Sequence, residues 1–194
     1  MRIGILNGET RDGDTELSQR LSALARRLIA AGHEVERLNL RDMEVRSCTG
    51  CWSCWWKTPG RCALVDDGDA VRRAWLRSDL LLFASPLLLG FPSALLKDAI
   101  DKLIPNALPF IRLGRSAEGR VECRHAPRYD RQPVLACLLE PGADDDDADV
   151  AIATRWFARL ADQFHSPFAW GYTTTTAPDV LLEAINATAR EATR

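Results

Sequence analysis

Short apolar runs alternate along the chain with stretches in which apolar residues recur every three or four positions. The runs at 3–6, 33–40, 80–84, 134–139 and 168–175 each predict a strand. Helical spacing predicts helices near 15–31, 70–75, 95–103 and 152–164, and a last helix from about residue 179. The first run lacks strict polar alternation, which is typical of a strand buried on both faces.

Five alternations of strand and helix predict one three-layer α/β domain over residues 1–194, with a parallel sheet covered by helices on both faces. A ligand site is then expected at the carboxyl ends of the strands. Two segments interrupt the alternation. They are a cysteine-rich loop at 48–62 and an excursion over 105–132, rich in Pro, Gly and Arg, whose length is typical of functional or mobile loops.

The charge balance excludes some partners. The chain has 25 basic and 27 acidic residues and a net charge of −2, so no overall field attracts nucleic acid or an anionic membrane. The first apolar run is too short for a signal peptide, and no run approaches the length of a membrane span. We therefore expect a cytoplasmic protein with reduced cysteines, in which a disulfide within 48–62 is disfavoured.

The loop after the first strand, residues 7–15, lies where this kind of fold binds a phosphate. Hydroxyls, a cation and glycines that permit close backbone approach suit an anion there: Gly8, Thr10, Arg11, Gly13 and Thr15. Three carboxylates do not suit a phosphate unless they point away from it: Glu9, Asp12 and Asp14. The alternative is that Asp14 or Thr15 simply caps the following helix.

Four cysteines are concentrated in fifteen residues with the spacing Cys-x₂-Cys-x₂-Cys-x₇-Cys: Cys48, Cys51, Cys54 and Cys62. Such a loop brings sulfurs together and suits a [4Fe–4S] cluster, which needs four thiolates. Zinc sites more often pair two separated Cys-x₂-Cys knuckles. The bulky Trp52, Trp55 and Trp56 favour instead a structural loop that covers a pocket or a subunit partner. Cluster, structural thiols and redox-active thiols all remain open on the residues alone.

Several motifs together resemble the flavodoxin-like NAD(P)H-dependent FMN reductases, in the branch that includes iron–sulfur flavoproteins and their cluster-free relatives. The first loop of that branch reads Gly-Ser-x-Arg-x-x-Gly-Asn-Thr. Gly8, Arg11, Gly13 and Thr15 fit it, whereas Glu9 and Asp14 replace the serine and the asparagine. The other matching segments are Lys57–Cys62 with Asp66-Asp67, then Ser85-Pro86, Gly90, Lys97 and Asp101, and finally His125, Arg128 and Tyr129.

The resemblance implies a strand order of 2-1-3-4-5, with FMN between the first and third strands. Its phosphate is expected on residues 8–15 and its ring against the backbone of 85–90. The implied cofactor-binding residues are Gly8, Glu9, Thr10, Arg11, Gly13, Asp14, Thr15, Ser85, Pro86, Leu87, Leu88, Leu89 and Gly90. If a cluster is present, its ligands are Cys48, Cys51, Cys54 and Cys62. No catalytic side chain is assigned.

The implied activity is hydride transfer from NAD(P)H to FMN, and then to a small acceptor such as free flavin or a quinone, in a homodimer. One alternative is an iron–sulfur flavoprotein that transfers electrons through the four cysteines. Another is a flavodoxin-like binding module that has lost its cofactor. The acidic first loop motivates the last alternative, as do Leu87–Leu89, which stand where relatives often carry aromatic residues.

Overall fold

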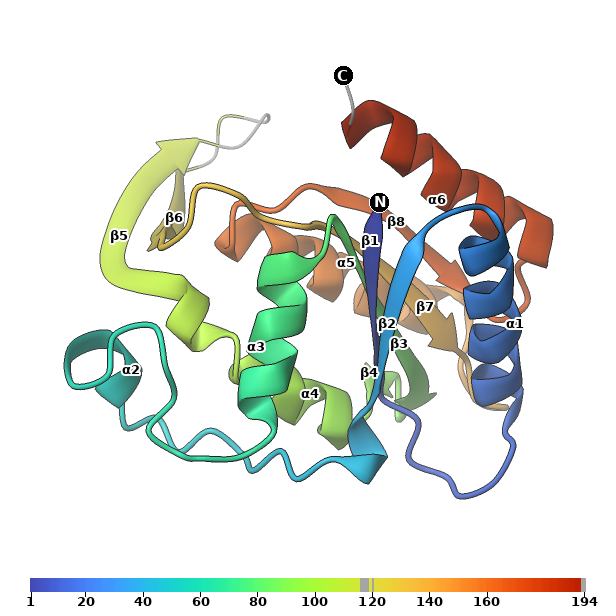
Figure 1. The fold of residues 1–194 in the computed structure, drawn as a ribbon, viewed down its shortest axis with the longest axis horizontal. Helices are drawn as coiled ribbons and strands as arrows, with labels where there is room; N and C mark the ends of the chain where they lie inside the picture. The colour runs from blue at the N-terminus through green and yellow to red at the C-terminus, as the bar shows by residue number, and fades with distance from the viewer. Residues whose placement is uncertain (116–118, 120, 193–194) are drawn as a thin grey trace.

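The computed structural model describes residues 1–115, 119 and 121–192 (Figure 1). Its main sheet has the order β2-β1-β3-β7-β8, and the pairs along this order are parallel. These strands are β1 (Arg2–Asn7), β2 (Glu34–Asn39), β3 (Leu80–Leu88), β7 (Val134–Glu140) and β8 (Phe168–Thr173). Numbered along the chain, the parallel strands have the predicted order 2-1-3-4-5, which is confirmed.

The strand register brings three loops to one edge of the sheet. Asn7, at the end of β1, lies opposite Asn39 of β2 and Ala84 of β3. Glu140, at the end of β7, lies opposite Pro86 of β3. The segments that follow β1, β3 and β7 are therefore neighbours, as expected at the switch point of a doubly wound sheet.

Helices cover both faces of the sheet (Figure 1). One face packs on α1 (Glu16–Ala30) and α6 (Pro178–Ala192), and the other on α3 (Gly68–Arg77), α4 (Ala94–Asp101) and α5 (Asp147–Gln163). The side chain of Thr15 caps α1 by accepting a hydrogen bond from the Ser18 N–H. The acidic run before α5 supplies a capping box formed by Asp146 and Asp149.

The predicted loop at 85–90 is largely wrong. Strand β3 continues to Leu88 because Ser85 and Pro86 still pair with β7. The chain then turns at Leu89 and Gly90, whose φ angles are +54° and +73°, into the short antiparallel strand β4 (Phe91–Pro92). This segment is therefore a tight hairpin, which leaves little free backbone before its tip.

The excursion over 105–132 contains an antiparallel hairpin rather than an irregular loop. It pairs β5 (Ala107–Arg115) with β6 (Val121–Pro127); residues 116–118 and 120 lie outside the described residues. Two short 3₁₀ helices, η1 (Leu40–Asp42) and η2 (Ile104–Asn106), and the four-residue α2 (Ser53–Trp56) complete the elements. Within the described ranges, no helix is long and apolar enough to cross a membrane.

Candidate functional site

The loop between β1 and α1, residues 8–15, is held in place at its start and is called the anion loop below. The Gly8 N–H donates to the Ala84 carbonyl at 2.8 Å, and the Gly8 carbonyl accepts from the Ser93 hydroxyl at 2.6 Å. A Cβ at residue 8 would lie 2.8 Å from both Ser93 Oγ and Leu96 Cβ. Only glycine fits there, so the anion loop begins at a fixed point beside β3 and α4.

The carboxylate of Glu9 receives the hydrogen bonds of the anion loop. Its Oε1 accepts from the Arg11 backbone N–H at 2.9 Å and from Arg11 Nε at 2.9 Å. Its Oε2 accepts from Arg11 Nη2 at 2.7 Å and from the Thr15 hydroxyl at 2.6 Å. Glu9 is only 1% exposed. Arg11 and Thr15, which suit an anion, therefore bind an anion that belongs to the chain itself.

The electrostatics of Glu9 follow from these contacts. Burial alone would raise its pKa, but the hydrogen bonds from Arg11 and Thr15 and the Arg11 charge lower the pKa to about 2. The same carboxylate raises the pKa of Arg11, since it stabilises the guanidinium. At neutral pH, the anion loop thus contains a closed ion pair.

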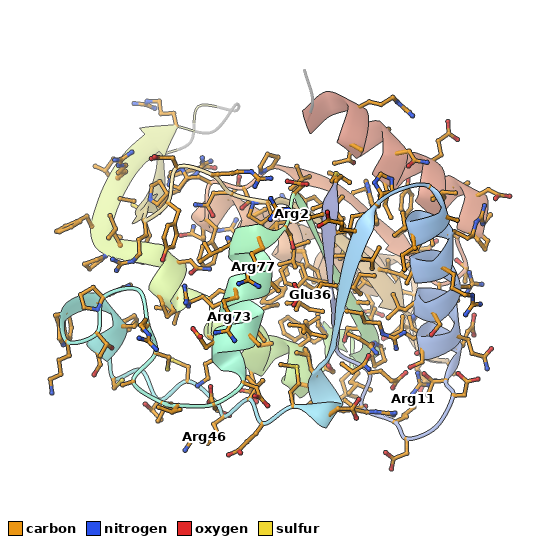
Figure 2. All side chains as sticks on the ribbon, viewed as in Figure 1. Arg2, Arg11, Glu36, Arg46, Arg73 and Arg77 are labelled. Carbon is orange, nitrogen blue, oxygen red and sulfur yellow. The ribbon has the colours of Figure 1, made fainter. Side chains whose placement is uncertain are left out.

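Arg11 also joins the anion loop to the end of β7. Its guanidinium forms a second ion pair with Glu140 at the end of β7, and Arg41 donates to the Arg11 carbonyl. Figure 2 labels Arg11 beside the loop that joins β1 to α1. The other predicted loop residues, Thr10, Gly13 and Asp14, are exposed. The cation of the loop is therefore flanked by two carboxylates.

The predicted ring-side residues divide into two groups. The side chains of Ser85, Pro86 and Leu87 are buried, and the Ser85 hydroxyl donates to the Pro86 carbonyl while accepting from the Ser93 N–H. Leu88 is half-exposed and Leu89 is fully exposed at the hairpin tip. Leu88 and Leu89 are thus the side chains of this segment available to a flat ring, and Gly90 lies beside them.

The four clustered cysteines line a single cavity together with Lys102, Ile104 and Pro105. Cys48 and Cys51 are exposed, whereas Cys54 and Cys62 are partly buried. All six cysteines are free thiols. Among the described residues, no three Cys, His, Asp or Glu side chains come close enough to hold a single metal ion. The four thiols therefore share one cavity without already forming a mononuclear metal site in the described part of the chain.

The thiols around this cysteine cavity influence one another. Burial, followed by the nearby Cys62, Cys48 and Cys51, raises the pKa of Cys54. Hydrogen bonds from the backbone and hydroxyl of Ser53 lower the pKa of Cys51. The three neighbouring thiols thus act on Cys54. Cys137, by contrast, is a core residue whose pKa burial raises to about 12, in agreement with its expected place in a strand.

A buried ammonium lies beside the cysteine cavity. Lys102, which is 2% exposed, donates to Asp66 Oδ2 at 2.8 Å and lies 3.7 Å from Cys62 Sγ. Asp66 also accepts from the Arg46 N–H, and Figure 2 labels Arg46 on the segment that leads from η1 to α2. Lys102 is not among the predicted site residues, because helical periodicity places it at the end of α4 but gives no sign of its contact with Cys62, forty residues away.

The remaining motif residues hold the cysteine loop in place. The rings of Trp52 and Trp55 stack with centroids 4.5 Å apart, and Trp55 packs on His125 of β6 at 5.2 Å. His125 Nδ1 also contacts the Leu108 carbonyl, and Arg128 Nε donates to the Pro105 carbonyl. The predicted His-x-x-Arg element therefore joins the cysteine loop to the β5–β6 hairpin.

A family profile and similar proteins of known description indicate the family of the chain. The profile of "NADPH-dependent FMN reductase" matches residues 1–117. The chain belongs to this family. An iron–sulfur flavoprotein of Archaeoglobus fulgidus is 33% identical over 103 residues, which are 53% of this chain and 45% of that protein. An iron–sulfur flavoprotein of Methanocaldococcus jannaschii is 34% identical over 110 residues, covering 56% and 54% of the two chains. This FMN reductase family member thus spans about half the length of these relatives.

Solved structures share the fold over nearly the whole chain. The NAD(P)H:quinone oxidoreductase of Methanothermobacter marburgensis has a TM-score of 0.64 at 16% identity, covering 97% of this chain and 94% of its own. An FMN-dependent NADH-azoreductase of Bacillus anthracis, solved with FMN, has a TM-score of 0.57 at 15% identity, covering 100% and 99%. At such identities the likeness shows the flavodoxin-like fold.

Proposed function

We propose that this member of the FMN reductase family is a flavin-dependent NAD(P)H oxidoreductase that passes electrons to a small acceptor. The observation that carries the proposal is the meeting of the segments after β1, β3 and β7 at the switch point of a 2-1-3-4-5 sheet. The apolar tip at Leu88 and Leu89 suits one side of a flat aromatic ring. A bound flavin supplies hydride and electron transfer.

The residues present fit the ring of FMN better than its phosphate. The hairpin tip offers exposed apolar surface, whereas the Arg11 and Thr15 donors of the anion loop already bind Glu9. The chain's own contribution at the ring end is to exclude water and to orient the ligand. Quinones and azo compounds are the acceptors named for the structural relatives, and an aromatic acceptor of this class is the proposed one here.

The test of this proposal is a flavin titration followed by turnover. Flavin added to the purified chain is expected to bind, and NAD(P)H oxidation is expected to depend on both the flavin and an added quinone. A chain that binds no flavin of any kind contradicts the proposal and favours the binding module without a cofactor.

A second candidate function, an iron–sulfur flavoprotein, is favoured by the cysteine cavity. Cys48, Cys51, Cys54 and Cys62 would supply the four thiolates of a [4Fe–4S] cluster, with Lys102 placed to stabilise negative charge on Cys62. A cluster there would supply one-electron transfer. The curated relatives carry the same description, which supports this interpretation.

Purification without oxygen distinguishes the two functions. About four iron and four acid-labile sulfide per chain, with a broad visible absorption, are expected for the cluster. Protein that contains flavin but no iron, even after reconstitution with iron and sulfide, would support the reductase function and contradict the iron–sulfur function.

The β5–β6 hairpin supports a further part of the proposal, a homodimer. Ile111 and Leu113 of β5 pair with His125 and Cys123 of β6, so these side chains share a face of the hairpin. Ile111 is 55% exposed and Leu113 is 74% exposed. Figure 1 shows this hairpin projecting from one side of the sheet, at the upper left. A second copy of the chain would bury such an apolar face.

Light scattering of the wild type and of the Leu113→Glu variant tests the dimer. The wild type is expected at twice the chain mass and the variant at the mass of one chain, because a charge on the apolar face disfavours its burial. A monomeric wild type contradicts this part of the proposal.

A further inference from the structure

Arg11 and Thr15 of the anion loop already bind a carboxylate of the chain itself. Four hydrogen bonds, from 2.6 to 2.9 Å, end on the two oxygens of Glu9. They use the Arg11 N–H, two nitrogens of the Arg11 guanidinium and the Thr15 hydroxyl. The same guanidinium also pairs with Glu140 from β7. Two of the side-chain donors expected for a ligand phosphate, Arg11 and Thr15, are therefore bound to carboxylates of the protein.

A phosphate at this place would meet one of two penalties. If Glu9 stays, a phosphate dianion lies beside a buried carboxylate, and like charges at short distance repel strongly in such surroundings. If Glu9 leaves, a side chain that is 1% exposed must move and give up four hydrogen bonds. The exposed Asp12 and Asp14 on the same loop, and the run Asp144–Asp147 after β7, add further negative charge to this edge of the sheet.

A flavin without a phosphate avoids both penalties. Its ribityl chain ends in a neutral hydroxyl, which carries no charge for Glu9 to repel and needs no cationic partner. The apolar contacts at Leu88 and Leu89 concern the ring alone and do not change with the phosphate. The phosphate end thus selects between flavins, while the ring end accepts both.

We propose that Glu9 is a built-in substitute for the cofactor phosphate, so that this site takes a flavin lacking the 5′-phosphate in preference to FMN. The inference rests on the proposed flavin-dependent function and names the class of flavin that the site accepts. Within the family motif it assigns to Glu9, in place of the usual serine, the role of a specificity-determining residue.

Equilibrium titration of the full chain with riboflavin and with FMN, followed by flavin fluorescence, tests the proposal without any turnover. In the wild type, riboflavin is expected to bind at least as tightly as FMN. In Glu9→Ser, the Arg11 and Thr15 donors are no longer bound to a carboxylate at residue 9. FMN is expected to bind this variant about 10-fold tighter or more, because charge-assisted hydrogen bonds to its phosphate become available. Riboflavin affinity is expected to change by less than about threefold, since its contacts do not involve Glu9.

Asp12→Asn is the matched control. It removes one negative charge from the same loop, but Asp12 is exposed and lies outside the Glu9 hydrogen bonds. FMN affinity is expected to rise by less than about threefold in this variant, because exposed charges are screened. An increase equal to that of Glu9→Ser would mean that net charge alone is at work, and would overturn the role of Glu9.

The outcomes separate this inference from the proposed function. A wild type that binds FMN more tightly than riboflavin overturns the inference and leaves the flavin-dependent function standing. Failure of both flavins to bind the wild type and both Glu9 variants overturns the two together. If Glu9→Ser does not fold, the wild-type comparison still decides, and Glu9→Gln, which keeps the side-chain length, replaces it.

Discussion

The anion loop and the cysteine loop differ in how far their reactive groups are already used. In the anion loop, the Arg11 guanidinium, the Arg11 N–H and the Thr15 hydroxyl all bind Glu9, at distances between 2.6 and 2.9 Å. In the cysteine loop, four free thiols line one cavity, and Lys102 approaches Cys62. One motif is internally satisfied, whereas the other presents its ligating atoms to a shared space.

The difference shows that residue types at the right spacing indicate which ligand a loop could bind, but not whether its donors are free to bind that ligand. Arg11 and Thr15 have the chemistry of a phosphate site, but the neighbouring carboxylate already binds their donors. The four cysteines are free thiols, and the adjacent Lys102 pairs with Asp66 at 2.8 Å while it lies 3.7 Å from Cys62 Sγ. Figure 1 shows the two loops on different sides of the chain, with α2 at the left and the β1–α1 loop at the lower right.

The largest expected effect concerns the cysteine cavity. If the four thiols hold a cluster, replacing Cys54 with Ser is expected to lower the bound iron and sulfide of anaerobically prepared protein by about 10-fold or more, because a cluster needs all four thiolates. Iron and sulfide analysis and the visible spectrum measure the effect. Cys123→Ser is the control, since Cys123 lies on the β6 strand outside the cavity. Equal metal contents in the two variants would argue that the thiols are structural.

The second effect concerns the buried ion pair beside the cavity. Replacing Lys102 with Met leaves the Asp66 carboxylate, which is 1% exposed, without its ammonium partner. Breaking such a pair is expected to cost about 3–5 kcal/mol of the free energy of unfolding. Urea unfolding measures this loss, and adding Asp66→Asn to the variant is expected to restore part of it. If a cluster is bound, the same change should lower its reduction potential, since a positive charge near its sulfurs is lost.

The sheet order and most helices follow from the sequence, whereas the contacts that define the two sites do not. A buried strand such as Leu80–Ala84 consists of consecutive apolar residues, so the sequence of that segment alone predicts it. The continuation of β3 through Ser85 and Pro86 depends on pairing with β7, some fifty residues away. The sequence alone indicates that the Glu9 carboxylate disfavours a phosphate, but only the folded loop shows that this carboxylate turns inward to Arg11 and Thr15. Lys102 likewise acquires its role from Asp66 and Cys62, which no local spacing joins to it.

The third effect concerns Glu9 and depends on pH. Its pKa falls from 4.5 to about 2 in the folded chain, so the stabilisation is complete above about pH 4.5 and is lost as the pH falls toward 2. Glu9→Gln is expected to lower the free energy of unfolding at pH 7 by about 2–3 kcal/mol, allowing for the exposed Arg11. The difference from wild type should narrow between pH 5 and pH 3 in urea titrations. A gap independent of pH would mean that packing, rather than charge, holds Glu9 in place.

The smallest effect provides the baseline for the buried pair. Lys97 and Asp101 lie on α4, which ends just before Lys102, and are joined at 2.7 Å, but their side chains are 41% and 35% exposed. Lys97→Met is therefore expected to change the free energy of unfolding by less than about 0.5 kcal/mol, because solvent screens the pair. Comparable losses for Lys97→Met and Lys102→Met would show that burial does not distinguish the two lysines. A large loss for Lys102→Met alone would show that burial, and not the ion pair by itself, sets the contribution of the ammonium beside Cys62 to stability.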